Sequence, residues 1–278
     1  LTDGSRVRHG FFAQFVAKVA RGEVRPGSDV REVRWFATLP QSMAFRDDYL
    51  EDFGRLPRSR GSDTAQTSLD ASRIPGGGMR RKPALLIVDL QNDFCPGGAL
   101  PVRDGDAIVP RVNRTIKTFE RRGLPVLATR DWHPATTKHF KEFGGAWPRH
   151  CVQGTKGARF HPKLQLPKRA TILSKGMDPE QDSYSGFQAV TPAGRDLESV
   201  VRDLAVDEIV VCGLATDYCV RATALDAVRR GIRVRVLADA IKGVDVHPDD
   251  SVAAVREMRS AGVAFAQTRG IARLLPPL

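Results

Sequence analysis

The stretch VCGLATDYCV (211–220) holds a cysteine, Cys219, in surroundings that suit a catalytic nucleophile. Cys219 follows a short polar turn and falls in the first turn of a predicted helix, which we expect Thr216 or Asp217 to cap. The positive end of a helix dipole and its free backbone N–H groups favour a thiolate. The same groups, with the N–H of Ala215, are suited to hold an oxyanion. These residues predict attack of a cysteine thiolate on an acyl group.

A thiol nucleophile needs a base and a cation, and two predicted strands end on such groups. Asp89 lies near the end of the apolar run ALLIVDL (84–90), and Lys175 closes ATILSK (170–175). The carboxylate can exchange a proton with the thiol, and the ammonium can stabilise negative charge. Taken singly, an acid after a strand often caps a helix, and a lone lysine is usually solvated. Cys212 lies inside an apolar strand, so we interpret it as a core residue.

Histidines gather with an acid in a second cluster, which begins at DWHPATTKHF and continues to WPRHC. Its four candidate metal ligands are Asp131, His133, His139 and His150. A carboxylate with two or three imidazoles, leaving room for water, is typical of sites for one Zn²⁺, Fe²⁺ or Mn²⁺ ion. The alternative is a loop held by hydrogen-bonded histidines. His161 and His247 lie outside this cluster and have the character of loop or surface residues.

The elements that would position these groups alternate between strands and helices along the chain. Apolar runs predict strands at 84–90, 125–132, 170–175, 208–214, 232–240 and 263–268. Helical spacing of apolar residues predicts helices at 106–123, 197–206, 216–231 and 249–262. This alternation predicts a three-layer α/β/α fold around a mostly parallel, Rossmann-like sheet of six strands. Ligands of such sheets bind beyond the carboxyl ends of the strands, where the candidate residues fall.

Residues 1–78 differ in character from residues 79–278. They contain two short apolar patches and a stretch rich in Ser, Arg, Asp and Gly, so we expect a poorly ordered or non-native extension, with a small packed appendage as the alternative. Met79 directly follows PGGG, and we hypothesise that translation starts there. No targeting segment is evident in the first residues. The domain of alternating strands and helices is expected to span 79–278.

Charge and cysteine usage bear on partners and compartment. The formal net charge is +11, yet the basic residues are scattered and no basic run is interleaved with aromatic residues, so we expect no nucleic-acid partner. No window is long and apolar enough for a membrane span, so no membrane partner is expected either. The four cysteines form no CxxC pair, which favours free thiols in a reducing compartment, the cytoplasm.

Five stretches together resemble the nicotinamidases of the isochorismatase-like cysteine hydrolase superfamily. They are IVDLQNDFCPGGAL, ATRDWHP, WPRHCVQGT, SKGMDPEQDSYSGF and VCGLATDYCVRATALDA, and they span the chain from Met79 to about Gln267. The resemblance implies an isochorismatase-like fold and a catalytic triad of Asp89, Lys175 and Cys219. It also implies metal ligands at Asp131, His133 and His150, with His139 added in some members. Tyr218 departs from the histidine that many bacterial members have before the cysteine.

The resemblance further implies the shape and the use of the pocket. Its oxyanion hole falls on Ala215 and Cys219, next to a cis peptide bond between Leu214 and Ala215. Its substrate-binding walls fall on Phe94, Leu100, Trp147 and Tyr184. The implied reaction is hydrolysis of nicotinamide to nicotinate and ammonia through a cysteine thioester, in NAD salvage, and a homo-oligomer is left open. The alternatives are a related amidohydrolase of the same superfamily acting on another small amide, and a catalytically idle binding protein of this fold.

Overall fold

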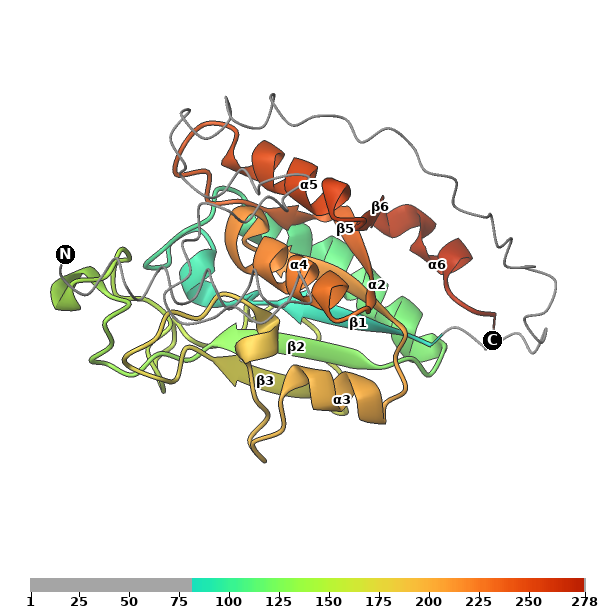
Figure 1. The fold of residues 1–278 in the computed structure, drawn as a ribbon, viewed down its shortest axis with the longest axis horizontal. Helices are drawn as coiled ribbons and strands as arrows, with labels where there is room; N and C mark the ends of the chain where they lie inside the picture. Colours follow the sequence, from blue (N-terminus) through green and yellow to red (C-terminus); the bar gives the residue numbers. More distant parts are fainter. Residues whose placement is uncertain (1–81, 278) are drawn as a thin grey trace, which may run out of the picture. The chain divides into compact units, whose positions relative to one another are not determined.

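The computed structural model describes residues 82–277, which contain a six-stranded sheet in the order β3-β2-β1-β4-β5-β6 (Figure 1). The strands are β1 (Pro83–Val88), β2 (Val126–Asp131), β3 (Thr171–Lys175), β4 (Glu208–Leu214), β5 (Arg233–Lys242) and β6 (Ala264–Ala266). All five strand pairings are parallel, which confirms the predicted fold class and makes the sheet wholly parallel. The expectations for residues 1–78, including a start at Met79, lie outside the described residues.

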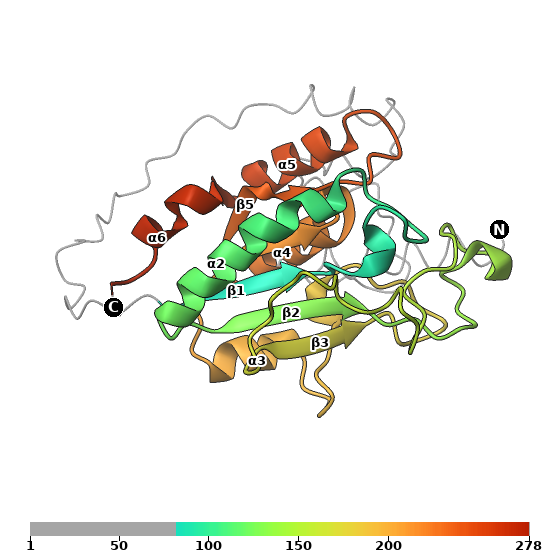
Figure 2. The ribbon, with the colours of Figure 1, turned by 180° about the vertical axis from the view of Figure 1, so that it is seen from behind.

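Helices cover both faces of the sheet. They are α2 (Val109–Arg121), α3 (Leu197–Asp203), α4 (Arg221–Arg229), α5 (Asp250–Ser260) and α6 (Ile271–Leu274). In Figure 1, α3 and α4 lie on the near side of the sheet, and Figure 2 shows α2 covering the opposite face. Short 3₁₀ turns occupy Asn92–Phe94, Gly105–Ile108, Lys141–Phe143, Gly186–Gln188 and Thr268–Gly270, and a π-helical turn spans Thr216–Val220.

The central strand β1 divides the core into two halves. Side chains alternate between the two faces of a strand, so Leu85 and Ile87 pack with residues of α2 and α6. Leu86 and Val88 instead pack with residues of α3, α4 and α5. Burying each of these side chains stabilises the fold by roughly 1.5–3 kcal/mol. This two-sided burial explains why β1 is apolar without interruption and why it anchors the middle of the sheet.

The predicted cap of the Cys219 helix is not present in the structure. The helical segment begins at Thr216 with Ala215 as its N-cap, and no side chain caps it, so the predicted cap at Thr216 or Asp217 is wrong. The Asp217 carboxylate instead accepts hydrogen bonds from the backbone N–H groups of Val244 and Asp245, at 2.9 and 2.8 Å. The Asp217 carboxylate therefore binds a loop that is distant in sequence and does not cap its own helix. The short helix α6 was not predicted.

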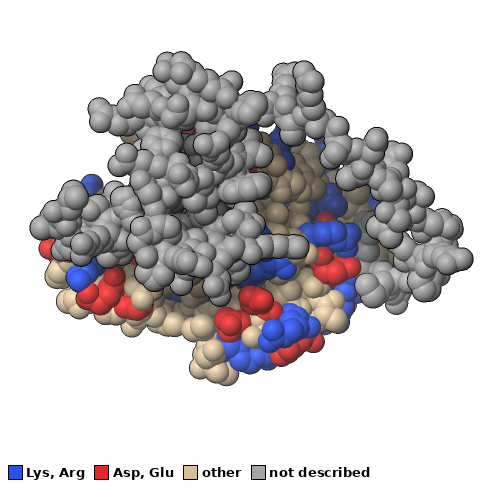
Figure 3. Space-filling view, in the orientation of Figure 1, with Lys and Arg blue, Asp and Glu red and all other residues tan. Residues whose placement is uncertain are grey.

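Charged side chains of both signs are mixed on the described surface visible in Figure 3. Several of them form exposed ion pairs on or beside α3 and α4, such as Arg230–Glu198, Arg229–Asp226 and Arg233–Asp207. Such exposed pairs contribute about 0–1 kcal/mol each. The absence of a nucleic-acid partner stays a prediction. Among residues 82–277, no helix has the length and hydropathy to cross a membrane.

Candidate active site

Four chemically active side chains meet at the carboxyl edge of the sheet. Asp89 directly follows β1, Asp131 ends β2, Lys175 ends β3, and Cys219 lies in the turn after β4. These strands are consecutive neighbours in the sheet, and the β2–β3 register pairs Asp131 directly with Lys175. Parallel neighbours end at the same edge, so residues far apart in sequence come within side-chain reach.

The predicted triad residues form one buried cluster around the Lys175 ammonium. Lys175 Nζ lies 3.1 Å from Asp89 Oδ2 and 3.5 Å from Cys219 Sγ, and it also contacts Asp131 Oδ1. The Cys219 sulfur and one oxygen of each carboxylate lie within 4.8 Å of one another. Thr129 Oγ1 donates a hydrogen bond of 2.7 Å to Asp89 Oδ1, which fixes the orientation of that carboxylate. The structure thus brings together a thiol, two carboxylates and a cation.

A glycine allows the ends of β1 and β4 to approach this closely. Gly213 has a φ of 120°, and a Cβ at this position would lie 2.0 Å from the carbonyl oxygen of Val88. Only glycine tolerates both the backbone angle and the contact. Asp89 itself has a left-handed φ of 47°. A non-glycine residue in this region is uncommon and concentrates at functional sites.

Burial and the shared cation set the protonation of the cluster. Burial raises the pKa of Asp89 above its ordinary value, and Lys175 offsets this only in part. Burial acts in the same direction on Asp131, but there the Lys175 ammonium and His133 outweigh it and the pKa is lowered. The pKa of Lys175 is raised because Asp131 and Asp89 outweigh its burial. Burial also raises the pKa of Cys219, so its thiol needs a base before it can attack.

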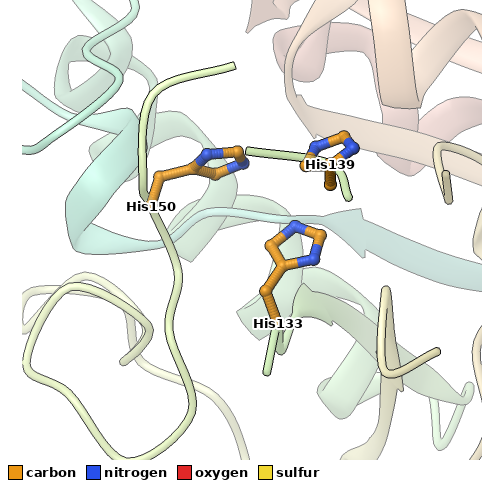
Figure 4. Close-up of side chains that lie close together, drawn as sticks. All are labelled: His133, His139 and His150. Atoms are coloured by element: carbon orange, nitrogen blue, oxygen red, sulfur yellow. The ribbon is translucent and has the colours of Figure 1, made fainter. Parts of the chain in front are cut away.

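Three buried histidines lie beside this cluster with their rings facing one another (Figure 4). His133, His139 and His150 each offer one ring nitrogen within 4.8 Å of those of the other two. Their Nδ1 atoms are engaged with acceptors: Gly176 O at 3.0 Å, Asp182 Oδ1 at 2.5 Å and Pro148 O at 2.7 Å, respectively. An Nδ1–H donor leaves the Nε2 lone pair free on each ring.

The arrangement of this histidine cluster fits a divalent metal ion. His133 Nε2 is buried and has no hydrogen-bond partner, as is typical of a metal-ligand nitrogen. Burial lowers the pKa of His139 and lowers that of His150 to about 4, so both rings are neutral at physiological pH. Asp131 Oδ2 lies 3.6 Å from His133 Nε2 and 3.9 Å from His150 Nε2. Asp131 therefore links the imidazoles to Lys175, and this donor set suits Zn²⁺, Fe²⁺ or Mn²⁺.

A small pocket connects the two clusters. Its lining includes Cys219 and Ala215 together with Asp131, His139 and His150. The four predicted wall residues, Phe94, Leu100, Trp147 and Tyr184, all line this cavity. These largely aromatic walls suit a small, planar molecule.

Comparison with known proteins places this architecture in a family. The isochorismatase domain family matches residues 83–269. The chain belongs to the isochorismatase family. The nicotinamidase of Escherichia coli is 44% identical to it over 201 residues, which cover 66% of this chain and 93% of that protein. The nicotinamidase/pyrazinamidase of Mycobacterium tuberculosis is 44% identical over 186 residues, covering 65% and 96%.

A solved structure gives the same result. The pyrazinamidase of Pyrococcus horikoshii in complex with zinc is 48% identical, with a TM-score of 0.62 over 67% of this chain and 99% of that one. These findings confirm the resemblance read from the five sequence motifs. The cis peptide bond between Leu214 and Ala215, which that resemblance implied, is also present. Cys212 is fully buried in β4, as predicted, and all four cysteines are free thiols.

Ser183 and Val244 also line the cavity and were not predicted from the sequence. Tyr218, singled out in the sequence because it stands where many bacterial members have histidine, lines the cavity as well. It packs edge-on against Trp147 with the ring centroids 4.9 Å apart. Trp147 Nε1 donates a hydrogen bond of 3.0 Å to the Tyr184 hydroxyl, which locks this aromatic wall in place.

Gln91 is a second type of missed residue, because it positions a functional group without touching the cavity. Its buried side chain donates to the carbonyl of Asp131 at 2.8 Å and accepts from the Asp131 N–H at 2.8 Å. It also donates to Ala158 O at 2.9 Å. Gln91 therefore fixes the backbone that carries Asp131. It lies in the motif IVDLQNDF, but nothing in that motif alone indicates its partner.

Proposed function

We propose that this chain is a nicotinamidase, which hydrolyses nicotinamide to nicotinate and ammonia through a thioester on Cys219. The observation that carries this proposal is that one small cavity borders both the Asp89–Lys175–Cys219 cluster and the histidine cluster. Its lining by Phe94, Trp147 and Tyr184 suits a single aromatic ring that carries one carboxamide. The 44% identity to the nicotinamidase of Escherichia coli supports the same substrate.

The metal would be held by His133, His139, His150 and Asp131, and when bound it supplies a Lewis acid for the pyridine nitrogen. The aromatic side chains of Phe94, Trp147 and Tyr184 then confine the ring, with the carboxamide directed towards Cys219. A site that fixes both ends of a small substrate converts binding into correct orientation of the reacting atoms.

The first half-reaction transfers the acyl group to sulfur. Asp89 accepts the Cys219 thiol proton, and the thiolate attacks the carboxamide carbon. The backbone N–H groups of Ala215 and Cys219 stabilise the resulting oxyanion. The proton held by Asp89 then passes to the departing nitrogen, which leaves as ammonia, and the carbon–nitrogen bond breaks. The raised pKa of Asp89 suits it to take up and return this proton.

The second half-reaction releases the acid. Asp89 removes a proton from a water molecule, and the water oxygen attacks the thioester carbon. The carbon–sulfur bond breaks, the proton held by Asp89 passes to the Cys219 sulfur, and the released nicotinic acid loses its own proton to solvent as nicotinate. Lys175 remains an ammonium throughout, since its pKa is raised by the neighbouring carboxylates. Its position 3.1 Å from Asp89 and 3.5 Å from Cys219 allows it to offset whichever of the two carries the negative charge.

The natural partner in this account is a small primary amide, and the setting we infer is NAD salvage in the cytoplasm. Four free thiols support a reducing compartment. The alternative is a related amidohydrolase of the same family acting on another small amide. The three facing imidazoles favour the nicotinamidase. A metal ion held by them can bind the ring nitrogen of nicotinamide, and an amide that lacks a ring nitrogen does not use this interaction.

A panel of primary amides tests this proposal. We expect the full chain loaded with Zn²⁺ or Mn²⁺ to release ammonia and nicotinate from nicotinamide in equal amounts. Benzamide has the same shape but lacks the ring nitrogen, so its kcat/KM should be lower by about 10²-fold or more, the range for an unpaired polar site. Ammonia release from a carbamoyl compound at a higher kcat/KM than from nicotinamide would instead favour the alternative amidohydrolase.

A further inference from the structure

The three histidines are not held by the same kind of partner. His133 and His150 each donate their Nδ1–H to a backbone carbonyl, Gly176 O and Pro148 O. His139 instead contacts a carboxylate, with 2.5 Å between its Nδ1 and Asp182 Oδ1. The Asp182 side chain is 62% exposed, whereas that of His139 is only 4% exposed. Asp182 thus reaches from the surface to the buried face of the histidine cluster.

The segment that carries Asp182 is tied to the loop that carries His139. Pro179 O accepts hydrogen bonds from the Lys138 N–H at 2.8 Å and from Thr137 Oγ1 at 3.1 Å. Lys138 also forms an exposed ion pair with Glu180. Side chains on an exposed loop usually lose entropy when they are fixed. Here the hydrogen bonds to Pro179 O already hold the two segments together, so fixing the Asp182 carboxylate against the His139 ring costs little further conformational entropy.

The geometry points to Asp182 as a positioning residue that makes His139 a strong metal ligand in this chain. A carboxylate on Nδ1 fixes the tautomer and ring orientation and raises the basicity of Nε2. It also adds a negative charge near a divalent cation, which a backbone carbonyl does not. This inference rests on the proposed metal centre and adds to it the residue that determines whether His139 takes part.

The role of Asp182 is tested by metal binding without substrate. The full chain is stripped with a chelator and titrated with Zn²⁺ against a competing indicator. We expect Asp182→Ala to weaken Zn²⁺ binding by about 10- to 100-fold, as is typical when an outer carboxylate is lost. Asp182→Asn keeps an acceptor oxygen without the charge, so its Zn²⁺ affinity should lie between those of the parent and of Asp182→Ala. Glu180→Gln removes a carboxylate from the same segment and breaks only its exposed ion pair with Lys138. The Pro179 hydrogen bonds to the His139 loop remain, so Zn²⁺ binding should stay within about twofold of the parent.

A double-mutant cycle separates this role from a general effect on the loop. In a His139→Ala background, Asp182→Ala should change Zn²⁺ binding by less than about twofold, because Asp182 acts through His139. Circular dichroism in excess chelator checks that each variant is folded. The inference would be overturned if Asp182→Ala bound Zn²⁺ within twofold of the parent. It would also be overturned if Asp182→Ala weakened Zn²⁺ binding as much in the His139→Ala background as in the parent. A parent chain that binds no Zn²⁺ would instead overturn the metal centre itself.

Discussion

Cys219→Ala lowers the rate of ammonia release from nicotinamide by at least about 10³-fold, because Cys219 is the one thiol that lines the cavity within residues 82–277. In the structure, the Cys219 sulfur shares the cavity with the histidine cluster and lies 3.5 Å from Lys175 Nζ. Substitution by alanine removes only the sulfur, so substrate and metal binding should remain. The measurement is kcat for ammonia release, with nicotinamide binding to the variant followed by calorimetry.

Cys212→Ala is the matched control for that variant. Cys212 is the other cysteine of the stretch VCGLATDYCV, but it is fully buried in β4 and does not line the cavity. Burial raises its pKa, so it stays a thiol. The substitution should cost about 1 kcal/mol of stability and leave most of the activity. Loss of activity in Cys212→Ala together with retained activity in Cys219→Ala would show that Cys219 is not the nucleophile.

Lys175→Met should be both inactive and less stable. The change keeps the length of the side chain but leaves Asp89 and Asp131 buried without the ammonium that lies between them. Removing one partner from a buried ion pair typically costs about 3–5 kcal/mol. We expect a loss of that size in the free energy of unfolding, measured by urea denaturation. We also expect kcat to fall by at least about 10²-fold, as when a stabiliser of developing charge is removed.

Lys117→Met provides the comparison, because it changes the same side chain on the exposed face of α2. It should alter the free energy of unfolding by about 0.5 kcal/mol or less and leave kcat unchanged. If Lys175→Met matched Lys117→Met in both measurements, the buried ammonium would have no role in either folding or catalysis.

The fold was largely predictable because hydrophobic periodicity reports burial directly. The run ALLIVDL is apolar at every position before Asp89, and the structure buries β1 on both faces. Strand order was not predictable in the same way, because it depends on where each crossover helix returns to the sheet. The cap expected at Thr216 or Asp217 failed for a related reason. The Asp217 carboxylate binds a loop that follows β5, and no local propensity reveals such a contact.

The site residues also differ in how far the sequence could predict them. Asp89, Lys175 and Cys219 were accessible from sequence because parallel strands place their carboxyl ends at one edge, so each strand end could be inspected for chemistry. Residues that act through a partner were not accessible. Gln91 and Asp182 are ordinary polar residues until the structure shows that one holds the Asp131 backbone and the other the His139 ring.

The central step of the proposed reaction is the transfer of an acyl group to Cys219. The direct test is to quench the metal-loaded protein with acid during turnover of nicotinamide and to map its peptides by mass spectrometry. We predict one nicotinoyl group on the peptide that contains Cys219, removable by hydroxylamine as a thioester, and none on the Cys219→Ala variant. A nicotinoyl group on a different side chain, or nicotinate formed at the full rate while the Cys219 peptide stays unmodified, would contradict the account.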